Sequence, residues 1–216
     1  MPFTAQHIKS ARLHLQKSDP VMKRLLKQVG PFTARAHPDR FETLVNSIVS
    51  QQISTSAAKT IRSRLKSAVE QRSLQIEPAT RFSPASLLTF DIDELRELGV
   101  SRQKAVYLLD LADKVNSKTV NLQGMGRRSD DEIIAELTQV KGIGRWTAQM
   151  FLMFCLARLD VLPADDLGIK NAVRLNYELI ELPTVAKIES IAENWRPYAT
   201  VACWYLWRSL ETRPST

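Results

Sequence analysis

Apolar residues recur at helical spacing along most of this chain, and no segment sustains the alternation that is typical of a strand. The clearest run places five apolar side chains on one helical face: Phe41, Leu44, Val45, Ile48 and Val49. Two later segments, 146–157 and 197–210, are almost wholly apolar, as is typical of helices buried on all sides. The pattern predicts an all-α protein with these two helices near its centre.

Residues that start and stop helices divide the chain into its predicted elements. Asp19 followed by Pro20 predicts an N-cap and a first helical residue, and Gly30 is expected to end that helix. Four more positions are predicted N-caps, the last two with Glu three residues on, as in a capping box: Ser54, Ser83, Asp91 and Ser129. The stretch 116–128 contains two glycines and is predicted to be a loop.

Composition is that of a globular protein, and the net charge is compatible with an anionic partner without requiring one. The chain has 216 residues, 44% hydrophobic and 25% charged, which suits one domain or two small lobes sharing a core. Its formal net charge of +7 favours a nucleic acid or another anion as partner. No apolar run approaches the length of a membrane span, and the N-terminus lacks a secretory hydrophobic core.

Cysteines and histidines give no sign of a metal site. Cys155 and Cys203 lie within apolar helical patterns, which predicts two buried thiols in a reducing compartment. The histidines His7, His14 and His37 have no neighbouring cysteines or cluster of carboxylates, so no zinc site is expected.

A glycine turn, KGIGR at Lys141–Arg145, separates two helical patterns and is the best candidate for anion binding. Glycine lets a ligand approach the backbone closely, and the start of the next helix leaves N–H groups unpaired. Lys141 and Arg145 add positive charge, so the turn predicts a phosphate contact. A similar turn at Gly99–Arg102 is either a second, degenerate hairpin or an ordinary turn closed by a serine cap, and turn chemistry favours the latter.

Two carboxylates, Asp165 and Asp166, follow the glycine turn and stand where the next helix is predicted to begin. An aspartate at that place is an ordinary N-cap far more often than a catalyst, because the helix start stabilises its charge. A phosphate-binding turn and a carboxylate held at a fixed distance are nevertheless what chemistry on a nucleic acid requires.

Five segments in order resemble the helix-hairpin-helix DNA glycosylase superfamily from about residue 40 to residue 208. They are SIVSQQIS (Ser47–Ser54), LGVSRQKAVYLLDLA (Leu98–Ala112), VKGIGRWTA (Val140–Ala148), LPADDLGIK (Leu162–Lys170) and NWRPY…WYLWR (Asn194–Arg208). The chain is most similar to the alkylpurine branch, the 3-methyladenine DNA glycosylase II type. This resemblance implies an all-α fold of two helical lobes with the active site between them, without the N-terminal β domain of some relatives.

The resemblance also implies how the lobes divide the sequence. Residues 1–216 would form a single helical glycosylase unit. One lobe would extend from about residue 40 to 130 and carry the turn that enters the duplex. The other would extend from about residue 131 to 216, together with the N-terminal helices, and carry the hairpin and the catalytic aspartate.

By resemblance, Asp166 is the catalytic carboxylate. In the superfamily an inward apolar residue follows the catalytic aspartate three positions on, and Ile169 fits that place for Asp166, whereas Gly168 would fill it for Asp165. Asp165 is expected to be a local hydrogen-bonding partner. Trp146 stands where members that also cut the backbone carry a Schiff-base lysine, which implies a monofunctional enzyme with water as nucleophile.

The base pocket is expected to combine aromatic and apolar side chains: Trp146, Met150, Leu167 and Trp207. An aromatic face attracts the positive charge that is delocalised over an alkylated purine. Trp207 suits the core and the pocket equally well, whereas Trp204 is expected in the core. Met150 stands where a pocket tyrosine can occur in the family, which leaves the range of bases open.

DNA contacts are expected at two turns. Gln52 would fill the space left by a flipped nucleotide, although Gln51 and Gln52 also suit helix capping. The expected DNA-binding residues are Gln51, Gln52, Lys141, Gly142, Ile143, Gly144, Arg145 and Lys170. The backbone carbonyls of Thr138, Val140 and Ile143 are a candidate site for Na⁺ or K⁺. Two cysteines are too few for the iron–sulfur cluster of some superfamily members.

These features imply a monomeric base-excision repair enzyme that hydrolyses the N-glycosidic bond of alkylated purines, such as 3-methyladenine or 7-methylguanine, in double-stranded DNA. Two alternatives stay open: a non-catalytic helix-hairpin-helix protein that binds damaged DNA, and a glycosylase for another base, such as uracil or hypoxanthine. A pure binder has no use for Asp166, Gln52 and the tryptophans together. The expected location follows the DNA: cytoplasm and nucleoid in a bacterium, nucleus in a eukaryote.

Overall fold

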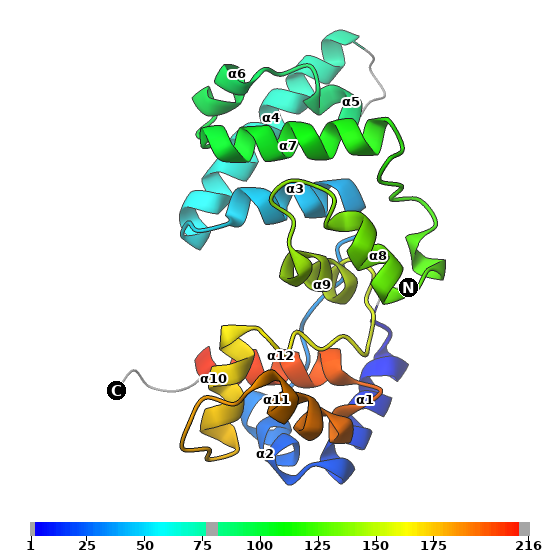
Figure 1. Ribbon diagram of the computed structural model, residues 1–216, viewed down its shortest axis with the longest axis vertical. Coiled ribbons are helices and arrows are strands. Elements are labelled where there is room, and N and C mark those ends of the chain that lie inside the picture. Colours follow the sequence, from blue (N-terminus) through cyan, green and yellow to red (C-terminus); the bar gives the residue numbers. More distant parts are fainter. Residues whose placement is uncertain (1–2, 77–81, 212–216) are drawn as a thin grey trace. The chain divides into compact units, whose positions relative to one another are not determined.

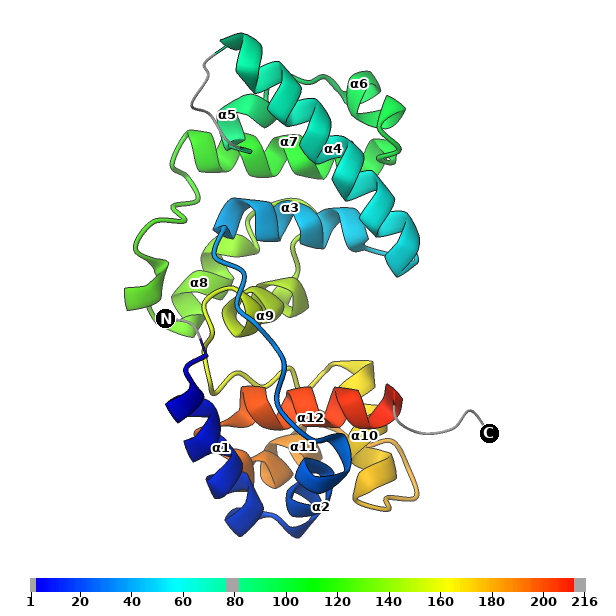
Figure 2. The same cartoon turned by 180° about the vertical axis from the view of Figure 1, so that it is seen from behind.

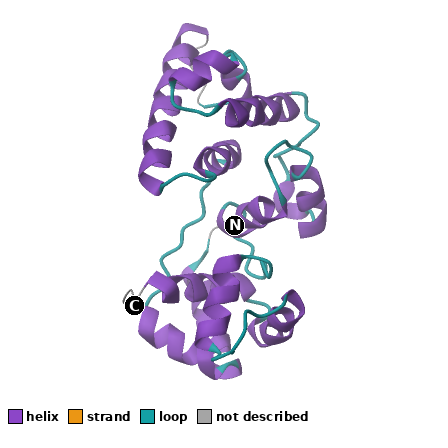
Figure 3. Cartoon of the chain, turned by 60° about the vertical axis from the view of Figure 1, so that its left-hand side comes forward, coloured by secondary structure: helices purple, strands orange, loops and turns teal. Residues whose placement is uncertain are grey.

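A computed structural model describes residues 3–76 and 82–211, which form twelve α-helices and two 3-10 helices. No strand occurs among these residues, as Figure 3 shows, and the all-α prediction is confirmed. Contacts divide the chain into two units: unit 1 comprises Met1–Ala36 and Leu152–Thr216, and unit 2 comprises His37–Phe151. Within the described ranges, no helix is both long enough and apolar enough to cross a bilayer.

Unit 2 is built around one long helix, α7 (Arg102–Asn116). In Figure 1 this helix runs beside α3, α5 and α6, and it packs against all three. Leu108 and Leu111 on its inner face are fully buried. The other elements of the unit are α3 (Arg40–Ser50), α4 (Thr55–Ile76), α5 (Pro84–Leu87), α6 (Ile92–Glu97), η1 (Met125–Arg127), α8 (Asp130–Leu137) and most of α9 (Arg145–Phe154).

Unit 1 joins the two ends of the chain around α12 (Ala199–Glu211), which packs against α1, α2 and α10 (Figure 2). Its other elements are α1 (Ala5–Ser18), α2 (Pro20–Val29), α10 (Leu167–Asn176), α11 (Val185–Ala192) and η2 (Glu193–Trp195). Asp19 is buried and accepts hydrogen bonds from Tyr177 Oη (2.5 Å) and Trp195 Nε1 (3.0 Å). Burial and the nearby Asp19 carboxylate raise the pKa of the Tyr177 hydroxyl. These contacts tie the N-terminal helices to the C-terminal half of the unit.

The predicted helix starts are confirmed, because capping depends on residues a few positions apart. Asp19 accepts hydrogen bonds from the N–H groups of Val21 and Met22, with Pro20 at the first helical position. Ser54 Oγ accepts from the N–H of Ala57 at 3.2 Å. The three remaining predicted caps each accept a hydrogen bond from a backbone N–H in the first turn of their helix. All three form complete capping boxes: Ser83, Asp91 and Ser129.

Three elements differ in extent from the sequence prediction. The helix predicted for 146–157 ends at Phe154, and Ala157 has a left-handed φ of 54° that no helix continues through. The helix predicted for 197–210 begins at Ala199, whose N–H donates to Asp160 Oδ1 at 3.2 Å. The predicted loop 116–128 contains the short helix η1. The turn before α7 is closed by Ser101, whose Oγ accepts from the Lys104 N–H, as the ordinary-turn interpretation predicts.

The two units do not coincide with the lobes that the resemblance implies, and those lobes stay a prediction. Unit 2 extends to Phe151, past the lobe boundary expected near residue 130. The hairpin therefore belongs to the same unit as Gln52 and not to the unit of Asp166. Cys203 is buried as predicted, but Cys155 is only partly buried, because α9 ends one residue before it.

Candidate active site

The glycine turn between α8 and α9, residues 141–144 and hereafter the hairpin, is shaped by its contact with α7. Gly142 has a φ of 80°, a conformation that side chains other than glycine rarely adopt. A Cβ atom at this position would also lie 2.1 Å from the Tyr107 ring. Ile143 is buried, whereas Gly144 is exposed and has open space where a Cβ would stand. The positive φ and the close contact with Tyr107 thus each require glycine at position 142.

Hydrogen bonding decides which hairpin N–H groups remain for a ligand. The N–H of Lys141 donates to Asp110 Oδ2 at 2.8 Å, and the N–H of Ile143 donates to the Val140 carbonyl at 3.1 Å. None of the hydrogen bonds between described residues uses the N–H groups of Gly142 and Gly144. The sequence predicted an anion site along the whole turn. The N–H groups of Gly142 and Gly144 are the donors that remain available for such an anion.

Asp110 anchors the hairpin electrostatically as well. Its carboxylate bonds the Lys114 ammonium at 2.6 Å and lies 3.9 Å from the Lys141 ammonium. Partial burial alone would raise the pKa of Asp110, but the hydrogen bonds from Lys114 and from the Lys141 N–H lower it overall. The Lys141 side chain remains 63% exposed, so its charge is accessible from solvent.

The turn between α3 and α4, residues 51–54 and hereafter the plug turn, separates the roles of its two glutamines. Gln51 Nε2 donates to the Gly142 carbonyl at 2.8 Å, so this side chain bonds within the protein. Gln52 is exposed and has a left-handed φ of 54°. A cavity of about 460 Å³ lies beside both residues and is also lined by Gly142 and Tyr107. The plug turn and the hairpin are therefore neighbours within unit 2.

Helix α9 presents Trp146 and Met150 one turn apart on the same side of the helix. Trp146 is 51% exposed although it is a large aromatic residue, and Met150 is half-buried. Arg145, at the first position of α9, is also exposed and adds charge beside the hairpin. An exposed indole next to free backbone donors is unusual for a core residue and suits contact with a base.

Asp166 is the N-cap of α10, and its Oδ1 atom accepts two hydrogen bonds. One comes from the Ile169 N–H at 2.7 Å, and the other comes from Trp207 Nε1 on α12 at 2.9 Å. The first is ordinary capping, whereas the second fixes the plane of the carboxylate from a distant helix. The sequence offered Trp207 as a pocket or core aromatic and did not reveal its role as a hydrogen-bond donor.

Gly168 makes the approach of Trp207 to the carboxylate sterically feasible. A Cβ at this position would lie 2.9 Å from Asp166 Oδ1 and 3.0 Å from the Trp207 indole nitrogen. Glycine in the first turns of a helix costs about 1 kcal/mol relative to alanine, which was the available signal for a special role.

The neighbours of Asp166 also have defined positions. Asp165 is 87% exposed and accepts a hydrogen bond from Lys170 Nζ at 2.5 Å, whereas the Lys170 side chain is only 19% exposed. Leu167 is 63% exposed, an unusual position for leucine. Burial, followed by the charge of Asp166, raises the pKa of the Cys203 thiol, so this cysteine is an inert core residue.

The predicted base-pocket residues come from both units. Trp146 and Met150 lie in unit 2, whereas Leu167 and Trp207 lie in unit 1. Trp207 is half-buried and has Phe154 as an aromatic neighbour, with ring centroids 6.2 Å apart. Trp204 is buried, which confirms its prediction as a core residue.

The hairpin carbonyls are compatible with the predicted monovalent cation. Among the described residues, the carbonyls of Thr138 and Ile143 accept no hydrogen bond, and the Val140 carbonyl accepts one. Three oxygen ligands from one turn suit a hard cation. Within the same part of the chain, no group of three His, Cys, Asp or Glu side chains could hold a metal ion.

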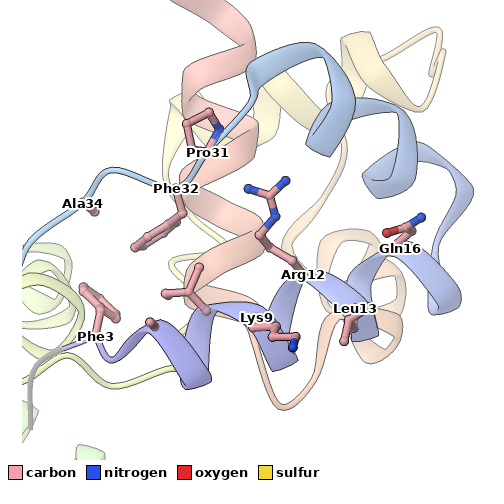
Figure 4. A pocket seen from close by; sticks show the side chains of 10 residues that line it. Phe3, Lys9, Arg12, Leu13, Gln16, Pro31, Phe32 and Ala34 are labelled. Carbon is pink, nitrogen blue, oxygen red and sulfur yellow. The ribbon is translucent and has the colours of Figure 1, made fainter.

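A second cavity, of about 640 Å³, lies in unit 1 between α1 and the segment after α2 (Figure 4). Figure 4 shows Phe3 and Phe32 on one side and Arg12 pointing in from α1. None of the predicted site residues lines this cavity, and Arg12 is engaged with the Gly30 carbonyl at 3.2 Å. The cavity is therefore separate from the candidate active site.

Comparison with known proteins places the chain in a family. Residues 45–197 match the family model described as HhH-GPD superfamily base excision DNA repair protein. The DNA-3-methyladenine glycosylase 1 of Schizosaccharomyces pombe is 35% identical over 203 residues, which are 92% of this chain and 86% of the relative.

Solved structures agree with this match. The Schizosaccharomyces pombe 3-methyladenine DNA glycosylase in complex with abasic DNA has a TM-score of 0.81 and 34% identity, covering 96% of this chain and 99% of that one. A DNA-3-methyladenine glycosidase from Bacillus halodurans has a TM-score of 0.80 and 32% identity, with coverages of 94% and 89%. The match of fold and sequence over most of its length shows that this chain belongs to the HhH-GPD superfamily of base-excision DNA repair proteins.

Proposed function

We propose that this protein is a monofunctional DNA glycosylase that excises alkylated purines, of the 3-methyladenine and 7-methylguanine type, from double-stranded DNA. The observation that carries the proposal is the carboxylate of Asp166, held by the Ile169 N–H and by Trp207 Nε1. A cap alone needs only the first of these bonds. The names of the relatives from Schizosaccharomyces pombe and Bacillus halodurans support the choice of substrate class.

Asp166 acts on the sugar in this proposal. Its carboxylate stabilises the positive charge that develops on the sugar as the N-glycosidic bond breaks, and it orients or deprotonates the attacking water. A cationic base is already a good leaving group, so little general-acid help is needed. The bond from Trp207 preorganises the carboxylate, which saves reorganisation during the reaction.

Trp146 recognises the base. The face of its indole attracts the delocalised positive charge of an alkylated purine, a contribution of up to about 2 kcal/mol when the pair is desolvated. Trp146 is 51% exposed on α9, a degree of exposure that suits contact with a ligand. Met150, one turn further along the same helix, supplies apolar surface for this base. In unit 1, Leu167 follows Asp166 with an exposed side chain, and Trp207 bonds the Asp166 carboxylate.

The hairpin and the plug turn hold the DNA. The N–H groups of Gly142 and Gly144, with the charges of Lys141 and Arg145, bind a backbone phosphate and position the protein without reading sequence. Gln52 enters the duplex and fills the gap that the flipped nucleotide leaves. A Na⁺ or K⁺ ion at the carbonyls of Thr138, Val140 and Ile143 would add positive charge beside the same phosphate.

One experiment separates this proposal from its alternatives. Duplex DNA carrying methylated purines is incubated with the protein, and the released bases are separated by chromatography. Release of 3-methyladenine or 7-methylguanine by the wild type, and none by Asp166→Asn, is the expected result. Release of uracil or hypoxanthine alone would indicate another base specificity. Tight binding of damaged DNA without any release would indicate a non-catalytic damage-binding protein.

A further inference from the structure

The three residues that hold the plug turn and the hairpin lie on one helix, α7. Lys104, Tyr107 and Asp110 are spaced three residues apart and therefore fall along one side of this helix. Tyr107 packs under Gly142, and Asp110 accepts from the Lys141 N–H at 2.8 Å. Lys104, at the other end of this row, reaches the plug turn.

Lys104 bonds the backbone at the end of α3. Its ammonium donates to the carbonyls of Val49 (2.8 Å) and Gln51 (2.6 Å). Carbonyls in the last turn of a helix lack partners within the helix, and a positive charge is favoured at that end. The ammonium is partly desolvated, and this burial lowers the pKa of Lys104.

Gln51 completes a bridge between the two DNA-binding turns. Its carbonyl accepts from Lys104 Nζ, and its side-chain amide donates to the Gly142 carbonyl at 2.8 Å. Lys104, Gln51 and Gly142 are thus joined in one continuous chain of hydrogen bonds within unit 2. Both turns also contact α7. A shift of the plug turn would break its bond with Lys104, and a shift of the hairpin would break its bond with Asp110.

The backbone of Gln52 shows why this bridge matters. A left-handed φ of 54° is unfavourable for a residue with a side chain and persists only where neighbouring contacts impose it. Gln51, which immediately precedes it, is fixed on both its backbone and its side chain by the bridge. Loss of the Lys104 bonds would free Gln51 and let Gln52 relax to an ordinary conformation.

We propose that Lys104 is a positioning residue that locks Gln52 in place relative to the phosphate-binding hairpin, through Gln51. The inference rests on the proposed function, because it assigns Gln52 to the flipped-nucleotide gap. The hairpin then binds the phosphate and Gln52 enters the duplex at a fixed distance from each other. Because Gln52 is already positioned, its insertion offsets part of the free energy needed to extrude a paired base. Lys104 contacts neither the base nor the sugar in this scheme.

The test compares two substrates that differ only in the cost of extrusion. One duplex carries a methylated purine in a normal pair, and the other carries it as an unpaired single-nucleotide bulge, which is easier to extrude. Lys104→Met keeps the aliphatic stem and removes the donors. We expect its single-turnover rate of base release to fall about tenfold or more on the paired substrate and less than about threefold on the bulged one.

Three further variants make the outcome specific. Lys104→Arg keeps donors for both carbonyls and should recover most of the rate on the paired substrate. Gln51→Leu removes the bond to Gly142 and should reproduce the dependence on substrate, even if Lys104→Met folds poorly. Lys66→Met, which removes a surface lysine of α4 in the same unit, should leave both rates unchanged.

The two substrates also distinguish the ways in which the inference can fail. Equal losses on paired and bulged DNA for both Lys104→Met and Gln51→Leu would indicate a merely structural role and overturn the inference. Unchanged rates would overturn it as well. If the wild type released no base from either duplex, the proposed function itself would be wrong, whatever the variants did.

Discussion

Trp207 donates its indole N–H to Asp166 Oδ1, the same oxygen that caps α10, at a distance of 2.9 Å. A carboxylate that served only as a cap would need no donor from α12. The second bond restricts the rotation of the carboxyl group about its side chain, and it is the clearest sign that this N-cap has a further task.

Asp166→Asn should abolish base release while the affinity for DNA with an abasic-site analogue stays within several-fold of wild type. Asparagine still caps a helix, but it carries no charge to stabilise the transition state. The measurement is the single-turnover rate of release together with the dissociation constant. Retention of more than about a tenth of the rate, a loss below ~1.4 kcal/mol, would contradict the assignment. The matched variant Asp165→Asn should be much milder.

Trp207→Phe should lower the rate of base release about tenfold or more with little change in binding of abasic DNA. The variant keeps the aromatic ring and removes the N–H, and a hydrogen bond to a charged group contributes about 1.5–3 kcal/mol. Trp204→Phe is the control, because Trp204 is a buried core residue. It should lower the melting temperature but spare the rate of the folded enzyme. A wild-type rate for Trp207→Phe would show that the bond is only structural.

Gly168→Ala should lower activity more than it changes stability. Alanine favours a helix by about 1 kcal/mol over glycine, but its Cβ would stand 2.9 Å from Asp166 Oδ1 and 3.0 Å from the Trp207 indole nitrogen. Thermal unfolding and single-turnover rate, measured on the same preparation, give both effects. Gly126→Ala is the control, since open space surrounds the position where its Cβ would be. An unaltered rate of base release by Gly168→Ala would show that a Cβ at this position does not disturb the Asp166–Trp207 pair.

Gly142→Ala should weaken binding to damaged and undamaged duplex alike, whereas Gly144→Ala should be tolerated better. The first variant forces a side chain into a left-handed backbone and against the Tyr107 ring, and the second meets open space. Backbone contacts with phosphate carry no sequence information, so the defect should not depend on the lesion. Titrations at several salt concentrations should show wild-type affinity falling as salt rises. A defect restricted to damaged DNA would argue against phosphate binding by the hairpin.

The wild-type enzyme should leave an intact abasic site and should not be trapped on DNA by borohydride. Trp146 stands at the place of the lyase lysine, and an indole cannot form the imine that borohydride reduces. Strand cleavage should appear only after hot alkali. Trp146→Lys should lose affinity for cationic bases, because a like charge replaces the aromatic face. Efficient trapping of the wild type would require another amine, with Lys170 the first to test.

Several features of this protein followed from the sequence because the physics behind them is local. Helical periodicity predicted an all-α fold, and capping residues predicted where helices begin at Asp19, Ser54 and Ser129. The resemblance of five segments, rather than local physics, led to the correct superfamily. The same resemblance selected Asp166 over Asp165 as the catalytic carboxylate; Asp166 is the N-cap of α10, and its catalytic role stays a prediction.

Tertiary structure decided everything that depends on residues far apart in the chain. The sequence could not show three hydrogen bonds between distant segments. The Lys141 N–H donates to Asp110, the Gln51 amide donates to the Gly142 carbonyl, and the Trp207 indole donates to Asp166. Nor could the sequence place the unit boundary after Phe151, since periodicity predicts that a segment is helical but not which neighbour it packs against. Local patterns thus determined which residues could take part in chemistry. Only packing, which brings separate helices within hydrogen-bonding distance, determined which donors bond within the protein and which remain available to a ligand.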